Sequence, residues 1–224
     1  MTRNLLSRFP AACGLFYVII GIVVVGDGGG DNAPTSSSSG EAIAAYAAAH
    51  PVGPFTGFGE IAALLILAVF VAALYAALIR AESAKGAAVV VLIGGILSVA
   101  IKLASLPAVF ALHSGGQATD PAVARAMMQI GDYAFQITLF TQALFLSAVA
   151  IGGLVSGAIP RWLAATGGVL AVALVVSAPV FGIQGFNPIE LFWLAWVAVA
   201  SVTLTIRRTA PGPVRPREAI AAAT

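Results

Sequence analysis

The chain has 224 residues, of which 60% are hydrophobic and only 9% are charged, and its mean hydropathy is +1.00. Soluble domains carry charge on about a quarter of their residues. So few polar side chains could not cover so much apolar surface in water, which excludes an ordinary water-soluble domain. The net charge of +2 is too small to indicate nucleic-acid binding. The single cysteine, Cys13, cannot form an intramolecular disulfide.

Six apolar runs are each long enough to cross a bilayer of about 30 Å as a helix, which takes ~17–25 residues. The runs cover residues 9–26, 61–79, 87–106, 129–152, 162–181 and 189–206. Each run is continuous, which favours helices over the alternating strands of a barrel. The predicted fold class is all-α, a polytopic transmembrane helical bundle of six spans over residues 1–210. A disordered cytoplasmic tail is expected at 211–224.

Basic residues gather on one side of the predicted membrane. With both termini cytoplasmic, only Lys102 and Arg125 of the eleven basic residues lie in the outer half. The other nine form the inner set: Arg3, Arg8, Arg80, Lys85, Arg161, Arg207, Arg208, Arg215 and Arg217. This distribution follows the positive-inside rule, and an even number of spans agrees with it. We therefore expect both termini to be cytoplasmic.

The first run follows Arg3 and Arg8, as the apolar core of a secretory signal peptide would. The Val-Val-Val-Gly-Asp sequence at its end lacks a small-x-small cleavage site, so we expect the run to remain as the first span. Residues 27–59 form the longest outer loop, and its first part is rich in glycine and serine and is expected to be flexible. The residues from Ser38 to Glu41 match a capping box, and an alanine-rich stretch then leads to Pro51, which predicts a short outer helix at 41–50.

Two later outer loops end in an Asx-Pro pair, Asp120-Pro121 and Asn187-Pro188. An Asx residue at the N-cap, followed by proline at the first helical position, begins a helix. We expect the helix after Asp120 to continue into the fourth span. The turn at 80–86 is short, so spans two and three should pack antiparallel.

The fourth span is the only one with a polar face. Its polar residues Gln129, Asp132, Gln136 and Ser147 fall within about 60° of one another on a helix of about 100° per residue. Polar residues of this kind can hydrogen-bond neighbouring helices, a contact typically worth only ~0.6 kcal/mol. They can equally form the wall of a water-filled cavity that opens to the outside. The sequence leaves both interpretations open.

Four ionisable residues lie in the outer halves of the predicted spans: Glu60, Lys102, Asp132 and Glu190. A charge near the bilayer centre costs about 2.5–3.5 kcal/mol, so such residues are expected to be paired or functional. Glu60 and Glu190 are predicted in first helical turns, where a carboxylate is favoured, and can be simple interfacial acids. Lys102 lies about 7 Å below Pro107, and either snorkels to the headgroups or forms a buried ion pair with Asp132 as the favoured partner.

Catalytic and metal-binding patterns are weak. The residues from Gly28 to Asp31 fit the Gly-x-Gly-Asp pattern of intramembrane aspartyl proteases, but they lie in a flexible loop without a second aspartate in mid-span. Ser156 lies at the inner end, whereas His50 and His113 lie outside, so no serine has a base within reach. Two histidines are too sparse to predict a metal site. We expect no enzyme activity, no cofactor and no metal.

Four short motifs carry a resemblance: Gly14-Leu15-Phe16-Tyr17, Ala44-Ala45-Tyr46 followed by His50, Asp120-Pro121, and Ile159-Pro160-Arg161-Trp162-Leu163. In these motifs and in its layout the chain resembles a group of six-span bacterial membrane proteins, common in actinobacteria and classed as a domain of unknown function. The resemblance covers most of the chain and implies a multi-pass protein of the bacterial inner membrane. It carries over no catalytic residue.

Two functions from different classes fit these features. The first is an outward-facing polar cavity for a small cationic or amphipathic solute or a lipid headgroup. Its candidate ligand-binding residues are Asp132, Gln136, Gln129, Lys102, Glu60 and Glu190. The second is a structural or accessory subunit of a membrane complex, in which the polar residues only hold helices together. The expected partners are the lipid bilayer, a small solute or lipid, and other membrane subunits, with no nucleic acid.

Overall fold

The computed structural model describes residues 2–25, 33–113, 120–181 and 187–207. Within these ranges the chain is almost entirely helical and forms no strand, so the predicted all-α class is confirmed. The helices are α1 (Thr2–Val25), α2 (Gly40–Ala49), α3 (Pro54–Leu78), the 3₁₀ helix η1 (Glu82–Ala84), α4 (Lys85–His113), α5 (Pro121–Ser156), α6 (Arg161–Phe181) and α7 (Ile189–Arg207). The glycine-rich part of the first outer loop and the tail at 211–224 lie outside the described residues.

Each predicted apolar run lies within one of the long helices, apart from Ile79, the C-cap of α3, and Gly26, which lies outside the described residues. Five helices, α3 to α7, are long and apolar enough to cross a membrane, whereas the apolar part of α1, Phe9–Val23, is shorter. α1 begins at Thr2, seven residues before its predicted run, and two other helices extend as far at their outer ends. α3 begins seven residues earlier than predicted, at Pro54, and α4 continues through Pro107 to His113. Proline removes one backbone hydrogen bond without ending this helix, because the flanking turns remain apolar and packed.

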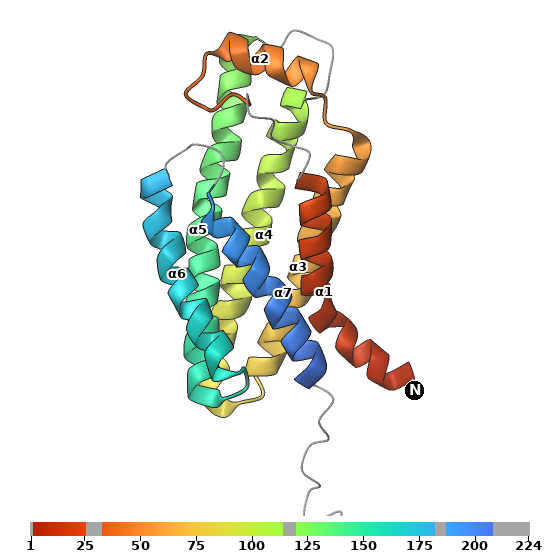
Figure 1. Cartoon of the computed structure of the whole chain (residues 1–224), viewed down its shortest axis with the longest axis vertical. Helices are drawn as coiled ribbons and strands as arrows, with labels where there is room; N and C mark the ends of the chain where they lie inside the picture. Colours follow the sequence, from red (N-terminus) through yellow and green to blue (C-terminus); the bar gives the residue numbers. More distant parts are fainter. Residues whose placement is uncertain (1, 26–32, 114–119, 182–186, 208–224) are drawn as a thin grey trace, which may run out of the picture.

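The six long helices form a closed ring in which each helix packs against its two neighbours, in the order α1, α3, α4, α5, α6, α7 and back to α1. The start of α1, the turn at η1, the α5–α6 turn and the end of α7 lie at one end of the bundle, and α2 lies at the other (Figure 1). We call the end that carries α2 the outer end, after the predicted orientation, and the opposite end the inner end.

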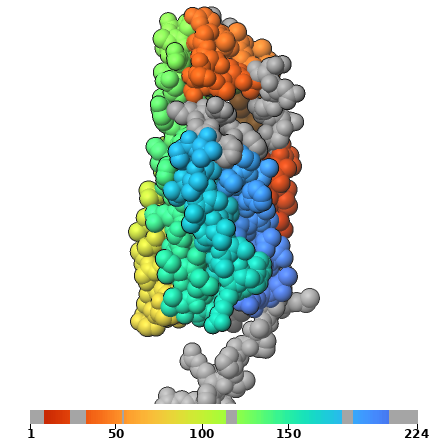
Figure 2. All heavy atoms as spheres, turned by 60° about the vertical axis from the view of Figure 1, so that its left-hand side comes forward, coloured from red at the N-terminus to blue at the C-terminus, as the bar shows by residue number. Residues whose placement is uncertain are grey.

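α4 and α5 extend beyond the other helices at the outer end, where α2 lies across them (Figures 1 and 2). A helix of 36 residues is about 54 Å long, well over the roughly 30 Å of a bilayer core. Ile43 and Ala47 of α2 are buried against Leu112 of α4 and Ala124 of α5. A Cβ on Gly40, the first residue of α2, would collide with the Pro121 carbonyl, so glycine permits this close contact. The short outer helix is therefore a cap on the bundle.

The N-cap of α2 is Ser39, whose hydroxyl accepts a hydrogen bond from the Ala42 N–H at 3.3 Å. The capping-box pattern had pointed to Ser38, one residue earlier. Ser38 instead accepts from the Thr35 N–H at 3.1 Å and closes a turn before the helix. The Ser39 hydroxyl and the backbone N–H of Glu41 both hydrogen-bond the Glu41 carboxylate, which lowers the pKa of that group from its ordinary value of 4.5.

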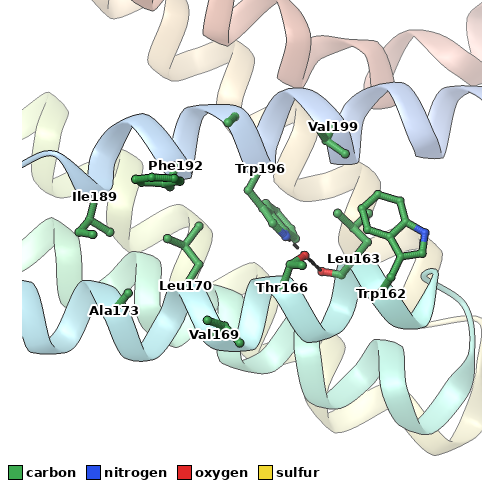
Figure 3. A pocket seen from close by; sticks show the side chains of 11 residues that line it. Trp162, Leu163, Thr166, Val169, Leu170, Ala173, Ile189, Phe192, Trp196 and Val199 are labelled. Atoms are coloured by element: carbon green, nitrogen blue, oxygen red, sulfur yellow. Dashed lines mark hydrogen bonds between the residues drawn. The ribbon is translucent and has the colours of Figure 1, made fainter.

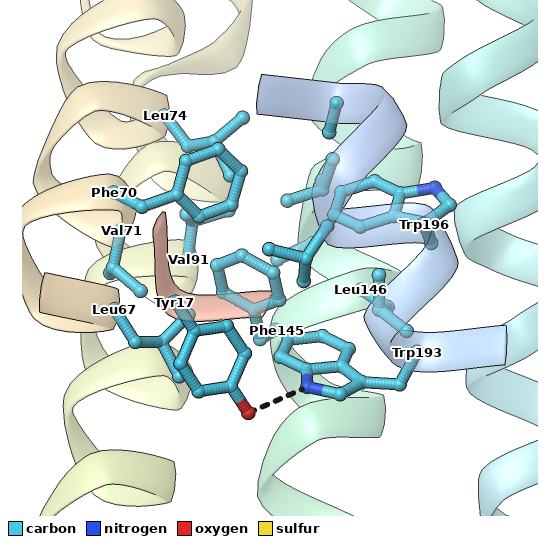
Figure 4. Close-up of a cluster of buried hydrophobic side chains, with 14 of the residues drawn as sticks. Tyr17, Leu67, Phe70, Val71, Leu74, Val91, Phe145, Leu146, Trp193 and Trp196 are labelled. Carbon is cyan, nitrogen blue, oxygen red and sulfur yellow. Dashed lines mark hydrogen bonds between the residues drawn. The ribbon is translucent and has the colours of Figure 1, made fainter. Parts of the chain in front are cut away.

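A cluster of large buried side chains fills the centre of the ring (Figure 4). The Phe145 ring meets the Trp193 and Trp196 rings edge-on, with centroids 5.7 Å and 6.3 Å away. The Trp193 indole N–H donates to the Tyr17 hydroxyl at 3.5 Å, which joins α7 to α1. Phe70 of α3 is fully buried in the same cluster. These aromatic side chains close the middle of the bundle, so a pocket near the outer end does not continue through it.

α4 and α5 pack with their backbones almost in contact. A Cβ on Gly94 of α4 would lie 2.9 Å from the backbone nitrogen of Phe145 in α5, closer than real Cβ atoms approach. One turn further out, the Ser98 hydroxyl hydrogen-bonds the Thr141 hydroxyl at 2.8 Å. Small residues at a membrane helix interface allow this close approach. The pair is therefore a rigid frame for the side chains that extend from its outer half.

α1 is joined to α7 in an unusual way. The Ser201 hydroxyl donates to the Ala11 carbonyl at 2.6 Å and accepts from the Leu15 N–H at 3.0 Å. In an uninterrupted helix these two backbone groups would bond to each other. A side chain that inserts into this ladder bends the helix, as does proline, and Pro10 lies immediately before the insertion. The first turns of α1 point away from the bundle (Figure 1).

Candidate functional site

A polar pocket of about 230 Å³ lies beneath α2, between the outer halves of α3, α4 and α5. It is lined by Glu60 of α3, by Lys102, Ser105, Leu106, Val109, Leu112 and His113 of α4, and by Met127, Met128, Gly131, Asp132 and Phe135 of α5. Three of the six candidate residues from the sequence, Glu60, Lys102 and Asp132, thus meet in one place. We call this space the polar pocket.

Lys102 is half-buried and its side chain points into the bundle. Its Nζ lies 5.3 Å from the centroid of the Phe135 ring, within the range of a cation–π contact. The ammonium group interacts electrostatically with Glu190 and Glu60. The sequence favoured Asp132 as its partner, but no ion pair within 4.0 Å joins Lys102 to any residue that the structure describes. The lysine therefore lies among carboxylates without direct contact to one of them.

Asp132 accepts hydrogen bonds from the hydroxyl and the backbone N–H of Ser36 in the loop before α2. Its Oδ2 atom is buried and has no hydrogen-bond partner among the described residues. A buried carboxylate oxygen without a donor is costly, so a ligand that supplies a donor or a positive charge there would be favoured. Asp132 also ties the cap to the bundle, because Ser36 belongs to the segment that leads into α2.

The two glutamates differ in position. Glu190 lies in the first turn of α7, as predicted, and its Oε1 atom is buried without a partner among the described residues. Glu60 is not in a first turn, because α3 begins at Pro54 and places Glu60 in the second turn. The Asn187 side chain caps α7 by accepting from the Ile189 N–H at 3.0 Å and donates to the Ser177 hydroxyl of α6 at 2.9 Å. Asn187 is thus a structural residue.

The predicted stripe on α5 has two parts. Gln129, Gln136 and Ser147 are half-buried and do not line the polar pocket, so only Asp132 of the stripe reaches it. Deeper on α5, Thr138 and Gln142 are almost fully buried. Thr138 donates to the Ala134 carbonyl at 2.8 Å, and Thr141 contacts Ser98 of α4. The bond between Ser98 and Thr141 joins α4 to α5, but neither residue belongs to the predicted stripe. Both interpretations of the stripe therefore remain predictions.

The charges around the pocket favour a cation. Glu60, Asp132 and Glu190 carry three negative charges when ionised, against one positive charge on Lys102. Phe135 and the two methionines supply an apolar wall. His113 Nδ1 lies 2.9 Å from the His50 carbonyl, to which it donates. No group of three or more potential ligands among His, Cys, Asp and Glu lies together in the described part of the chain.

Sequence reasoning missed several contributors to the site. Ser36 lies in a serine-rich loop, where no local pattern distinguishes it from its neighbours. Phe135 could have been found, because it is three residues from Asp132 and so shares its helix face. Tyr17, Trp193 and the rest of the aromatic cluster required the ring order, which a single sequence does not give.

A second hollow, which we call the α6–α7 groove, has a volume of about 520 Å³ and is almost wholly apolar (Figure 3). It is lined by Trp162, Leu163, Thr166, Val169, Leu170 and Ala173 of α6, and by Ile189, Phe192, Ala195, Trp196 and Val199 of α7. α6 and α7 pack least extensively of all neighbouring helices in the ring.

The chain matches no protein-family model, no curated protein and no solved structure. The resemblance to the six-span bacterial group therefore remains a prediction.

Proposed function

We propose that this is an integral membrane protein that crosses the bilayer six times, with both termini cytoplasmic, and binds a small cationic solute in the polar pocket. The structure is a helical bundle with five helices that could span a membrane, which is compatible with a membrane protein. α1 is proposed as the sixth span, since it completes the ring between α3 and α7. The positive-inside distribution supports the proposed orientation. The bacterial inner membrane is what the resemblance to the six-span group implies.

The observation that carries the solute proposal is the meeting of Glu60, Asp132 and Lys102 in one pocket, with Asp132 Oδ2 buried and unpartnered among the described residues. A volume of about 230 Å³ is that of roughly eight water molecules, at about 30 Å³ each, so the ligand is small. The proposed role is binding, because the pocket pairs a surplus of carboxylates with an apolar wall.

The test uses the full chain in detergent and two small probes of similar shape, tetramethylammonium and neutral tert-butanol. Tetramethylammonium should raise the unfolding temperature in a saturable manner, and tert-butanol should not. Asp132→Asn should weaken the affinity for tetramethylammonium about tenfold, the low end of measured couplings between close charges. The substitution keeps an oxygen that can accept from Ser36, so the fold is expected to survive.

Two further variants test whether the charges of the polar pocket determine its affinity for the cation. Lys102→Met removes the lysine ammonium group from the pocket and should strengthen the binding of the cation. Glu82→Gln is the matched control, because Glu82 is an exposed acid at the inner end. Equal affinity in the wild type, Asp132→Asn and Lys102→Met would show that the cation does not bind in the polar pocket.

The second candidate is a structural or accessory subunit of a membrane complex. It is favoured by the polar side chains deeper in the bundle, which hydrogen-bond within the protein, such as Ser98 with Thr141 and Asn187 with Ser177. Crosslinking and co-purification from native membranes should then return a stoichiometric partner. Recovery of the chain as a lone monomer would argue against this role.

A further inference from the structure

The α6–α7 groove lies on the outside of the ring, away from the polar pocket, on the face where α6 and α7 lie side by side (Figure 2). Two polar side-chain groups that border it are already bonded. The Thr166 hydroxyl and the Trp196 indole N–H both donate to the Leu163 carbonyl, at 3.0 Å and 3.1 Å (Figure 3). The groove therefore presents methyl groups and aromatic faces and requires no hydrogen bond from its occupant.

The length of the groove equals one leaflet of a bilayer. Trp162 lies at one end and Ala173 at the other (Figure 3), and the eleven steps between them correspond to about 16 Å of helix. On α7 the groove extends from Ile189 to Val199, about 15 Å. Half of a hydrocarbon core of about 30 Å is also about 15 Å. An acyl chain that starts beside Trp162 would fill the groove and reach the level of Ile189, the first residue of α7.

Positive charge lies at the inner end of the groove. Arg161, the first residue of α6, is exposed and adjacent to Trp162. α6 contains no acidic residue, and the only acid of α7, Glu190, lies at the opposite end. Trp162 is about half exposed, and tryptophan is enriched at the level of lipid headgroups. The inner end of the groove is therefore complementary to an anionic headgroup.

We propose that the α6–α7 groove binds one anionic phospholipid of the inner leaflet, with an acyl chain between α6 and α7 and the phosphate group at Arg161. The loose packing of α6 on α7 leaves the space that the acyl chain occupies. This site requires that the chain be embedded in a membrane. It does not require solute binding in the polar pocket, so the two proposals can fail separately.

The experiment is native mass spectrometry of the full chain, released from vesicles that contain equal amounts of phosphatidylglycerol and phosphatidylcholine. The wild type should retain one phospholipid, and phosphatidylglycerol should predominate. Ala195→Phe places a ring in the groove and should remove the retained lipid. Ala165→Phe is the matched control on α6. Ala165 is exposed and does not line the groove, so this variant should retain the lipid.

The preference for an anionic headgroup is tested by removing single arginines. Arg161→Gln should lower the preference for phosphatidylglycerol over phosphatidylcholine about fivefold, the effect of one arginine near an anionic surface. Arg80→Gln removes an exposed arginine at the inner end of α3, away from the groove, and should leave the preference unchanged. Equal losses in the two variants would show that the arginines act through general surface charge, and would overturn the site.

Other outcomes also decide the proposal. Retained lipid in Ala195→Phe would overturn it, and a dimer that Ala195→Phe dissociates would show that a second copy of the chain occupies the groove. If Ala195→Phe does not fold, tryptophan quenching in wild-type protein replaces it, since two of the three tryptophans line the groove. Brominated phosphatidylglycerol should then quench saturably at low mole fraction. Quenching that only follows the bulk mole fraction would overturn the proposal.

Discussion

The pairs α4–α5 and α6–α7 are built from similar apolar sequence but differ in how closely they pack. At Gly94 the backbones of α4 and α5 are almost in contact, and charged side chains extend from the outer half of that rigid frame. α6 and α7 pack less extensively, and an apolar groove lined by Trp162 and Trp196 lies between them. The comparison shows that close packing through small residues fixes the positions of polar groups, whereas looser packing leaves room for an apolar ligand.

The largest expected effect comes from breaking the close pair. Gly94→Ala places a Cβ against the Phe145 backbone and should lower the free energy of unfolding by about 1–3 kcal/mol. Because Lys102 and Asp132 are positioned by α4 and α5, the affinity of the polar pocket for tetramethylammonium should fall as well. The measurement is thermal unfolding in detergent, with and without the cation.

Gly86→Ala is the control on the same helix. Gly86 is exposed, and nothing lies within 4 Å of the position of its Cβ. The substitution should leave stability unchanged or raise it by up to about 1 kcal/mol, through helix propensity alone. Similar destabilisation by both substitutions would mean that contact between the α4 and α5 backbones is not what Gly94 provides.

The next effect concerns the junction of α7 with α1. Ser201→Ala removes both hydrogen bonds to α1 and should destabilise the protein by about 1 kcal/mol, since the freed Ala11 and Leu15 groups can partly bond to each other. Thr205→Ala removes a hydroxyl bond that lies within α7 and should cost less. The free energy of unfolding of both variants is measured by chemical denaturation. An equal loss of stability in the two would show that the hydrogen bonds between α7 and α1 add no stability.

A smaller effect distinguishes packing from hydrogen bonding in the close pair. Thr141→Val keeps the shape of the side chain and removes its bond to Ser98, so the cost should be near 0.6 kcal/mol. Gly94→Ala should destabilise the protein clearly more than Thr141→Val does when both are measured in the same detergent. The reverse order would identify the hydroxyl pair, and not backbone contact, as the main attachment of α4 to α5.

The smallest effect concerns the cap over the close pair. The pKa of Glu41 is lower in the folded protein than its ordinary value of 4.5, because of hydrogen bonds from its own N–H and from Ser39. The resulting stabilisation is present above pH 4.5 and is lost as the pH falls through the lowered pKa. The difference in unfolding temperature between wild type and Glu41→Gln should therefore shrink from pH 6 to pH 3. A difference that is constant with pH would contradict this assignment.

Most of the helices could be predicted because their apolar runs are continuous, and two of them begin at Asx-Pro pairs that cap them as expected. The Asp120 side chain accepts from the Ala122 and Val123 N–H groups, and Asn187 accepts from that of Ile189. The outer ends of α3 and α4 were missed, because α3 opens with proline and glycine and α4 continues through Pro107, residues that usually interrupt helices. Helix ends are fixed by local backbone bonds and by the α2 cap, which apolar content does not record.

The candidate site was predictable only in part. Residue type and depth identified Glu60, Lys102 and Asp132, which meet in the polar pocket. The partners of Lys102 could not be derived, because they depend on how each helix is rotated about its axis and on which helices are neighbours. Glu190 approaches Lys102 from a helix almost ninety positions away in the sequence. The α6–α7 groove results from the spacing between two helices, and neither helix shows it alone.

The Ser201 insertion has a consequence for biogenesis. α1 is synthesised before α7, and the hydroxyl that bridges its backbone lies 186 positions after Leu15. Until α7 enters the membrane, the Ala11 carbonyl and the Leu15 N–H can bond to each other, as in a regular helix. A chain truncated before Ser201 would therefore keep this part of α1 less bent than in the complete bundle.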